Sequence, residues 1–433
     1  MPRVQPTRME EAVAALRRRD TLGIPLGPGQ PAAFLHALNE RDDWEQLEVA
    51  GALLCDLFEV FTKPGVHYRS GFFGPAERFL LASGADVEFV PADFRRFGPV
   101  AAQLRPRVVA TLAAPPDAAG YMSLGLHAGA TFDELKRAGA DPERVLIVEV
   151  NDQCPRTLGL PPDYPHALHV DEVDLLVESD RPLFVLSEAD PTAVERAIAT
   201  LVDPYVIDGS TLQTGIGGIP AAVISQLAEE SGGDYGIHSE MFTTALMKLH
   251  RAGKVTNRRK GVFDGHSITT FAAGTAELNA WLDGNEDVRF LPVSIVNSPH
   301  VIARNRRMVT INSCLSIDLF GQVVADTIDG KQFSGIGGHE DFVGAPGLEL
   351  EDRSLLCLPS TWEVDGVARS RIVAKLPAGS VVTTPRHQLD VVVTEHGSAE
   401  LRGRTVRERA LALAELTHPD FREALREDAM RIG

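Results

Sequence analysis

The sequence predicts an α/β protein built from two related, open and mostly parallel halves. Apolar segments rich in β-branched residues alternate with helical segments, which is typical of a parallel sheet covered by helices. A Gly-x-Gly turn followed by Pro-Ala-Ala and an apolar pair occurs at 27–35 and again, with one extra residue, at 215–224. A length of 433 residues also suggests two or three domains. A turn-rich stretch at 179–191 favours a boundary there, so we expect domains over 1–190 and 191–433.

The first half alternates predicted strands and helices from its start. An amphipathic helix is expected over 9–19, because Ala12, Val13 and Leu16 recur at helical spacing. Residues 21–26 are predicted to form a strand that enters the first glycine turn. Further strands are expected over 47–54, 86–90, 108–112, 145–149 and 173–177, and a helix over 75–82.

The second half opens with a predicted helix over 192–201. A strand ending near Thr214 then enters the second glycine turn, and a helix over 220–228 follows, with Pro220 in its first turn, where a missing N–H costs little. A strand over 235–239 would return beside the first one as in a β-α-β unit. The remaining expected elements are β structure over 290–297, adjacent strands over 309–312 and 315–320, strands over 355–358 and 391–393, and a charged helical tail over 402–430.

The composition excludes several classes of protein. A formal net charge of -18 argues against nucleic acid or an anionic membrane as a partner. The basic segment 251–260 is expected to be either a solvated helix and loop or a rim that attracts phosphates. Four scattered cysteines without Cys-x-x-Cys spacing predict a reduced, cytoplasmic protein with no zinc site. No apolar run approaches the length of a transmembrane helix.

The candidate reactive group is the carboxylate of Glu240. It follows the predicted strand 235–239, and the glycine turn 215–218 is expected beside it at the carboxyl edge of the sheet, where open α/β sheets bind ligands. A carboxylate can attack an activated acyl group and form a covalent intermediate. The amides of a glycine turn can stabilise the negative charge that develops on the acyl oxygen.

Separate motifs resemble the acetyl-CoA hydrolase/transferase family, which includes 4-hydroxybutyrate and acetate CoA-transferases. The motifs occur in the same order as in the family, and together they span nearly the whole chain. The motifs lie at 215–220, 236–241, 312–323, 334–342 and 393–397. The resemblance implies a CoA-transferase-like fold in which the active site lies in a cleft between the two halves.

The resemblance also implies a reaction and a set of site residues. CoA would move from a short-chain acyl-CoA to a carboxylate by a ping-pong route through a glutamyl-CoA thioester on Glu240. The oxyanion donors would be the backbone N–H groups of Ile216 and Gly338. CoA itself would be a substrate, with no permanently bound cofactor and no metal, and the chain would form a homodimer or higher homo-oligomer. The implied CoA-contacting positions are Gly215, Gly217, Leu315, Ser334 and Gly337.

The sequence departs from the family pattern in a later loop. Relatives carry a Ser-Lys-x-Gly-Lys type of stretch that helps to hold CoA, whereas residues 348–354 here are Leu-Glu-Leu-Glu-Asp-Arg-Ser. We therefore expect a weaker attraction for the CoA phosphates. Two alternatives to a transferase remain open. One is an acyl-CoA hydrolase, in which water intercepts the thioester, and the other is a non-catalytic protein that binds CoA or an acyl ligand.

Overall fold

The computed structural model describes residues 6–346 and 349–432, which form two compact units. The first unit comprises Met1–Ser187 and Ile268–Val296, and the second comprises Glu188–Ser267 and Asn297–Gly433. Segment 268–296 thus belongs by its contacts to the first unit, whereas the expected boundary near residue 190 placed it in the second domain. Both units are built on a predominantly parallel sheet with helices, as predicted.

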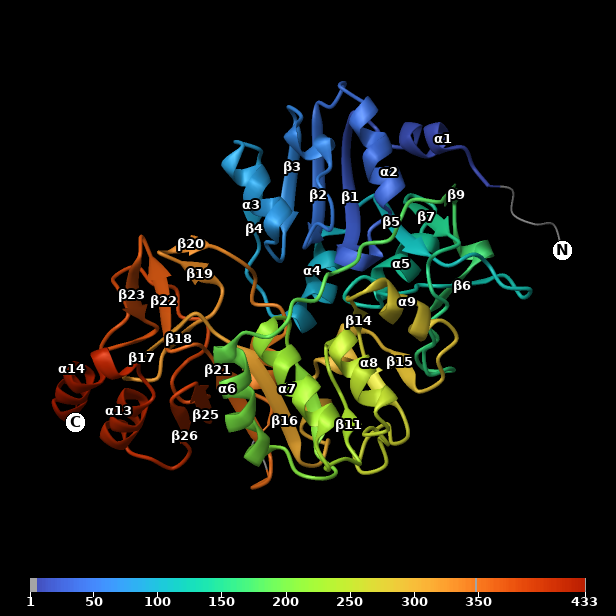
Figure 1. Cartoon of the computed structure of the whole chain (residues 1–433). Helices are drawn as coiled ribbons and strands as arrows, with labels where there is room; N and C mark the ends of the chain where they lie inside the picture. The colour runs from blue at the N-terminus through green and yellow to red at the C-terminus, as the bar shows by residue number, and fades with distance from the viewer. Residues whose placement is uncertain (1–5, 347–348, 433) are drawn as a thin grey trace. The chain divides into compact units, whose positions relative to one another are not determined.

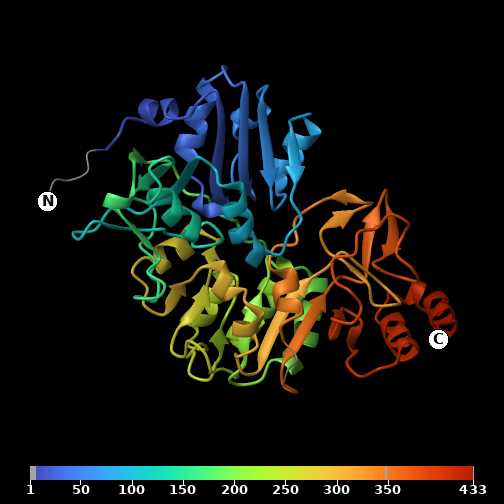
Figure 2. The same ribbon diagram turned by 180° about the vertical axis from the view of Figure 1, so that it is seen from behind.

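The first unit contains a seven-stranded sheet in which all paired neighbours run parallel. Strand β5 (Val108–Ala113) is fully buried along its length, as expected for a strand covered on both faces. The blue strands of this layer can be followed in Figures 1 and 2. The sheet order is β4 (Val87–Phe89), β3 (Val66–Ser70), β2 (Gln46–Ala52), β1 (Arg19–Leu26), β5, β7 (Val145–Asn151) and β9 (Leu175–Ser179).

Helices connect these strands. The predicted helix at 75–82 is confirmed as α3 (Pro75–Ala82), and proline stands at its first position. The main helices of the unit are α1 (Met9–Ala14), α2 (Ala32–Ala37), α3, α4 (Phe97–Leu104), α5 (Phe132–Gly139) and α9 (Ala276–Leu282). Smaller strands are β6 (Tyr121–Ser123), β8 (Ala167–His169) and β15 (Val288–Phe290).

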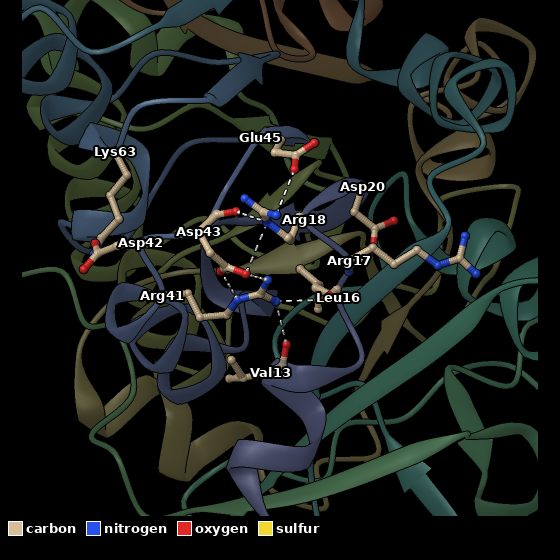
Figure 3. Close-up of polar contacts among 10 residues, drawn as sticks. All are labelled: Val13, Leu16, Arg17, Arg18, Asp20, Arg41, Asp42, Asp43, Glu45 and Lys63. Atoms are coloured by element: carbon tan, nitrogen blue, oxygen red, sulfur yellow. Dashed lines mark hydrogen bonds and ion pairs between the residues drawn. The ribbon is translucent and has the colours of Figure 1, made fainter.

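The first helix, α1, ends earlier than the predicted 9–19, and an arginine holds the chain that follows it. Arg41 donates hydrogen bonds to the carbonyl oxygens of Val13 and Leu16, at 3.3 and 2.7 Å, which satisfies acceptors left over at a helix end. The same guanidinium pairs with Asp43 (Figure 3). These contacts fix the end of α1 and the residues that follow it.

The second unit contains a six-stranded sheet that is parallel except at one edge. Figure 1 shows α6 (Ala193–Val202) and α7 (Gly218–Glu229) side by side against this sheet. Helix α6 begins with a capping box, in which Thr192 and Glu195 bond reciprocally to backbone N–H groups. The sheet order is β11 (Gly236–Ile237), β10 (Thr211–Thr214), β16 (Met308–Ser313), β21 (Arg353–Cys357), β25 (Val391–Thr394) and β26 (Gly397–Glu400).

Further elements complete the second unit. The C-terminal helices pack on each other, and their apolar faces join a core with the sheet. The remaining helices are α8 (Thr244–Arg251), α11 (Pro299–Ile302), α12 (His339–Val343), α13 (Val406–Glu415) and α14 (Pro419–Met430). A small three-stranded sheet has the order β18 (Val323–Val324), β17 (Ser316–Asp318) and β24 (Ile372–Val373). A separate hairpin consists of β22 (Thr361–Val364) and β23 (Val367–Ser370).

Two predictions of strands were wrong. Segment 290–297 forms the end of β15 and then a short helix, α10 (Val293–Val296), because an apolar run of this length suits either element. Strand β17 is not a neighbour of β16, since it pairs with β18 and β24 in the separate small sheet. Strand β3, which was not predicted, lies inside the first sheet, between β4 and β2.

Candidate active site

The predicted β-α-β unit around Glu240 lies within the second unit. Strands β10 and β11 are parallel neighbours, with Thr211 opposite Gly236 and Leu212 opposite Ile237. Helix α7 connects them, as expected from the sequence. Glu240 comes three residues after the end of β11, and the glycine turn comes directly after the end of β10. Both therefore lie at the carboxyl edge of this sheet.

A hydroxyl group ties the segment before Glu240 to the end of β10. The Ser239 hydroxyl accepts a hydrogen bond from the Thr214 backbone N–H at 3.3 Å and donates to the Met241 carbonyl at 2.9 Å. Ser239 and Thr214 are both buried. The backbone next to Glu240 is thus held against the residue that enters the glycine turn.

Two side chains distant in sequence continue the site. The Asn297 side-chain amide donates to Glu240 Oε2 at 2.5 Å and to Asp341 Oδ2 at 2.9 Å. Asn297 and Asp341 are fully buried, whereas Glu240 is partly buried. One amide therefore bridges two carboxyl groups and fixes the position of Glu240 Oε2.

The environment changes the acidity of Glu240. The pKa of its carboxyl group is raised to about 8, chiefly by burial; the hydrogen bond from Asn297 lowers this pKa, and the nearby charge of Asp341 raises it. The carboxyl group is consequently mostly protonated at neutral pH. It must lose this proton to solvent or to a base before it can act as an anion. Such a shift at the edge of a sheet is typical of functional sites.

Gly338 lies directly against the Glu240 carboxyl group. A Cβ at this position would overlap Glu240 Oε2 and would approach Asn297 Nδ2 to 2.5 Å. The backbone angles of Gly338 are ordinary, with φ at -91° and ψ at 10°, so glycine is required here for space and not for conformation. By contrast, Gly217 and Gly337 have φ values of 127° and 55°, which favour glycine for backbone reasons.

The remaining predicted residues are the oxyanion donor Ile216 and the CoA-contacting residues Gly215, Leu315 and Ser334. Gly215 follows β10, and a Cβ there would lie 3.4 Å from Asn312 Oδ1 on the neighbouring strand β16. Ile216, in the turn, is 58% exposed. Leu315 follows β16, and its carbonyl accepts a hydrogen bond from Arg371 at 2.9 Å. Ser334 bonds through its N–H to the Asp326 carbonyl at 3.0 Å.

Two buried polar side chains, Asn257 and Lys260, hold the backbone of β11. The Ile237 N–H donates to Asn257 Oδ1 at 2.9 Å, and the Ile237 carbonyl accepts from Lys260 Nζ at 2.8 Å. Lys260 also donates to the His266 carbonyl at 2.6 Å. Lys260 is fully buried, and burial lowers its pKa to about 7. The expectation that the whole basic segment 251–260 is solvated or forms a rim is therefore wrong for Lys260.

The acidic stretch, residues 349–352, lies at the opposite edge of the same sheet, where the strands begin. It leads into the start of β21, and Leu348 is outside the described residues. Asp352 is fully buried and accepts hydrogen bonds from the backbone N–H groups of Met308 at 2.9 Å and Glu349 at 3.3 Å. Its carboxylate thus holds the starts of β16 and β21 and does not face Glu240.

Asn297 and Asp341 were not among the predicted site residues. Asp341 lies inside the motif at 334–342, so its acidic side chain beside a glycine turn was a usable signal. Asn297 ends an apolar segment, which is a weaker signal. Neither residue reveals from sequence alone that it meets Glu240, since Asn297 is 57 positions away.

Within residues 6–346 and 349–432, no group of His, Cys, Asp or Glu side chains is arranged to hold a metal ion. In the same part of the chain, no helix is both long and apolar enough to cross a bilayer. The four cysteines are free thiols, and Cys154, Cys314 and Cys357 are buried while Cys55 is partly exposed.

Comparison with known proteins gives concordant matches. Residues 274–429 match the model of the acetyl-CoA hydrolase/transferase C-terminal domain. The chain is 35% identical to the 4-hydroxybutyrate coenzyme A transferase of Clostridium kluyveri over 423 residues, covering 96% of this chain and 95% of the relative. It is also 35% identical over 431 residues to the succinyl-CoA:cyclohexane-1-carboxylate CoA transferase of Geobacter metallireducens, covering 98% and 94%.

Solved structures agree with this result over the whole chain. The crystal structure of RipA from Yersinia pestis superposes with a TM-score of 0.90 at 32% identity, covering 99% of this chain and 97% of RipA. The 4-hydroxybutyrate CoA-transferase of Porphyromonas gingivalis gives a TM-score of 0.79 at 28% identity, with the same coverage. From its sequence and its fold, the chain belongs to the acetyl-CoA hydrolase/transferase family.

Proposed function

We propose that this protein is a CoA-transferase that moves CoA from a short-chain acyl-CoA to a carboxylate through a thioester on Glu240. The observation that carries the proposal is the placement of the Glu240 carboxyl group against Gly338, with Asn297 holding one of its oxygens. The names of the relatives support the class of reaction, since they describe transfer of CoA between carboxylic acids.

The first half-reaction transfers CoA to the enzyme. After Glu240 loses its proton, one carboxylate oxygen attacks the acyl carbon of the acyl-CoA, and the C–S bond breaks to release CoA thiolate. The thiolate then attacks the Glu240 side-chain carbon of the mixed anhydride, and the acyl carboxylate leaves. The product is a Glu240–CoA thioester and a free carboxylate.

The second half-reaction reverses these steps with an acceptor. The acceptor carboxylate attacks the thioester carbon and CoA thiolate leaves, which gives a new anhydride. The thiolate attacks the acyl carbon derived from the acceptor, and Glu240 is released as a carboxylate. In each step negative charge builds up on one oxygen. We assign its stabilisation to the backbone N–H groups of Ile216 and Gly338.

Asn297 and Asp341 have positioning roles in this proposal. A carboxylate is a poor nucleophile, so the distance and angle of attack must be well controlled. The Asn297 amide restrains Glu240 Oε2, and Asp341 restrains that amide in turn. The charge of Asp341 also raises the pKa of Glu240, which makes the ionised carboxylate more basic and a stronger nucleophile.

The proposal is tested by the mass of the intact protein after incubation with acetyl-CoA. A CoA adduct that hydroxylamine removes, and that peptide mapping places on Glu240, is the expected result. Exchange with added acetate is then compared with thiol release in water alone. Thiol release that is independent of any acceptor would identify a hydrolase, and the absence of an adduct and of both activities would favour a non-catalytic binding protein.

A further inference from the structure

Strand β11 leads to Glu240, and it is an edge strand of the six-stranded sheet. On its inner side, the N–H groups of Gly236 and His238 donate to carbonyl oxygens of the segment 210–212, at 2.9 and 3.0 Å. Successive residues of a strand turn their N–H and C=O groups to opposite sides of the strand. The N–H and C=O groups of Ile237 therefore point to the outer side, where no further strand of this sheet follows among the described residues.

A neighbouring segment takes the place of a strand on this outer side, but only as far as Tyr235. The Tyr235 N–H donates to the Lys254 carbonyl at 2.9 Å. The Tyr235 carbonyl accepts from the N–H groups of Thr256 and Asn257, at 2.9 and 3.0 Å. Asn257 has a φ of 55°, so the chain leaves the extended path there. The backbone bonds at Tyr235 are therefore not continued by backbone bonds at Ile237.

Two side chains bond to Ile237 instead. Asn257 Oδ1 accepts from the Ile237 N–H at 2.9 Å, and Lys260 Nζ donates to the Ile237 carbonyl at 2.8 Å. Each of these side chains has a second bond that holds it. Lys260 Nζ donates to the His266 carbonyl at 2.6 Å, and Asn257 Nδ2 donates to Ser267 Oγ at 3.0 Å. The amide and the amine thus supply the donor and the acceptor that a neighbouring strand would supply.

The aliphatic part of Lys260 lies against Gly236 of the same strand. A Cβ on Gly236 would overlap Lys260 Cγ and would approach Lys260 Cδ to 2.9 Å. Gly236 does not have a positive φ, so glycine is required there for space and not for conformation. Lys260 is fully buried. The strand therefore has no side chain at the place where the lysine crosses it.

The amine can keep both of its bonds with or without its extra proton. Burial lowers the pKa of Lys260 to about 7, and the charge of Asp264 opposes this change. An ammonium group has three N–H donors and a neutral amine keeps two, which is the number of carbonyls that Lys260 contacts. The two bonds therefore do not require a buried charge, which would be costly to remove from water.

We propose that Lys260 is a positioning residue for the reaction of Glu240. It fixes the Ile237 carbonyl three residues before the nucleophile, and the Ser239 hydroxyl holds the residue next to Glu240. All these residues belong to the second unit. Since about 1 Å of misplacement can slow a reaction ~10²-fold, loss of this restraint should slow the attack. The effect on the reaction rests on the function proposed for Glu240, whereas the restraint of the backbone does not.

The test compares Lys260→Met with Lys254→Met in the full chain. Methionine keeps an apolar side chain of similar length and removes the N–H donors. Lys254 is the matched control, because it lies in the same basic segment and its Nζ donates to the Glu230 carbonyl at the end of α7, and not to β11. Single-turnover formation of the CoA adduct at saturating acetyl-CoA should be about 10- to 100-fold slower in Lys260→Met. The acetyl-CoA concentration that gives half the maximal rate should not change, and Lys254→Met should react at the parent's rate.

Hydrogen exchange gives a readout that does not depend on activity. Peptides that cover 235–242 should exchange at least ~10-fold faster in Lys260→Met than in the parent, while peptides from β25 should not change. Lys260→Gln keeps an amide that can donate to one of the two carbonyls. It should slow adduct formation less than Lys260→Met does, and it replaces Lys260→Met if that variant does not fold.

Three results would overturn the proposal. They are adduct formation by the Lys260 variant at the parent's rate, an equal slowing in Lys254→Met, and unchanged exchange of 235–242. A parent that forms no adduct would refute the function of Glu240 and not the restraint, because faster exchange of 235–242 in the variant would still show that Lys260 holds this segment.

Discussion

Glu240 and Gly338 are matched in space: the carboxyl group of Glu240 occupies the volume that any side chain at position 338 would need. Because Gly338 has ordinary backbone angles, an alanine there would not be strained by conformation. Its Cβ would instead displace Glu240, Asn297 or both. This relationship makes position 338 a direct test of whether the place of the Glu240 carboxyl group matters.

Gly338→Ala is expected to fold and to lose activity by at least ~10²-fold, because a displacement of about 1 Å at a nucleophile has an effect of that size. The measurement is kcat/KM for CoA exchange between acetyl-CoA and a carboxylate. Gly344→Ala, at the other end of α12, is the control. Its Cβ would lie 3.3 Å from both Gln388 Nε2 and the Glu340 carbonyl oxygen, which are much looser contacts than the overlap with Glu240 Oε2 at position 338. Equal activities of the two variants would contradict the assignment.

The raised pKa of Glu240 predicts a pH dependence of stability. The folded-state pKa of about 8 exceeds the ordinary value of 4.5, so the native state binds the proton more tightly than the unfolded state. The stabilisation is fully present below pH 4.5 and is lost as the pH rises to 8. Glu240→Gln does not titrate. Its free energy of unfolding should therefore gain about 2–4 kcal/mol relative to the parent between pH 4.5 and pH 8.5, after allowance for the partial exposure of Glu240. Urea unfolding at these two pH values measures the difference, and a constant difference would refute the shift.

Asp341→Asn is expected to lower the pKa of Glu240, because it removes the negative charge that raises this pKa while keeping an oxygen that can accept from Asn297. In the parent, kcat/KM for acetyl-CoA should rise tenfold per pH unit and level off near pH 8, since only the carboxylate attacks. In Asp341→Asn, kcat/KM should level off at a lower pH than in the parent. Glu340→Gln is the control for removing a negative charge next to Asp341. The Glu340 carboxylate accepts a hydrogen bond from the Thr384 hydroxyl at 2.5 Å. Identical profiles for the parent and Asp341→Asn would rule out the electrostatic role.

The acidic stretch predicts a limited effect of salt. It lies one strand length from the edge that carries Glu240, and five residues of β21 span roughly 17 Å, which is about twice the Debye length in physiological salt. Glu351→Lys should therefore leave kcat unchanged. It should lower the KM for acetyl-CoA about twofold at low salt and make KM rise more steeply with salt, because a phosphate attraction is added. Glu423→Lys on α14 is the control, and an equal change in both variants would show an effect of net charge alone.

Much of the fold could be predicted because it depends on local patterns. Helix α3 begins at a proline that follows a glycine, and its bounds were predicted correctly. The alternation of strands and helices indicated a parallel sheet. The same reasoning failed at 290–297, where a short apolar run has no period that distinguishes a strand from a buried helix.

The candidate site was predictable only where its residues share a motif. Glu240 and the glycine turns lie in segments that the chain order brings to one edge of a sheet. Asn297 and Lys260 act through tertiary contacts with residues 57 and 23 positions away, and no local pattern specifies such partners. Lys260 is instructive, because its basic neighbours favoured a solvated segment while the fold buries its ammonium group under β11.

The final prediction concerns the nucleophile itself. Glu240→Gln keeps the size of the side chain and its ability to bond to Asn297 but removes the anionic oxygen. If catalysis is covalent, the variant should fold and bind acyl-CoA, lose essentially all turnover, and never form the CoA adduct seen by mass in the parent. If Glu240 only activated water, the loss would be of the order of 10²–10⁴ and the parent would show no adduct either.

Glu240→Asp separates chemistry from position. The carboxylate is kept but withdrawn by one methylene group, away from Gly338 and from the Asn297 amide. Since about 1 Å of misplacement can lower the rate ~10²-fold, the aspartate variant should be severely impaired but still form some adduct. Single-turnover measurement of the adduct with acetyl-CoA gives the rate directly. A glutamine variant with the parent's turnover would refute the mechanism, whereas an inactive glutamine variant and a slow aspartate variant together would establish that a carboxylate must stand at this place.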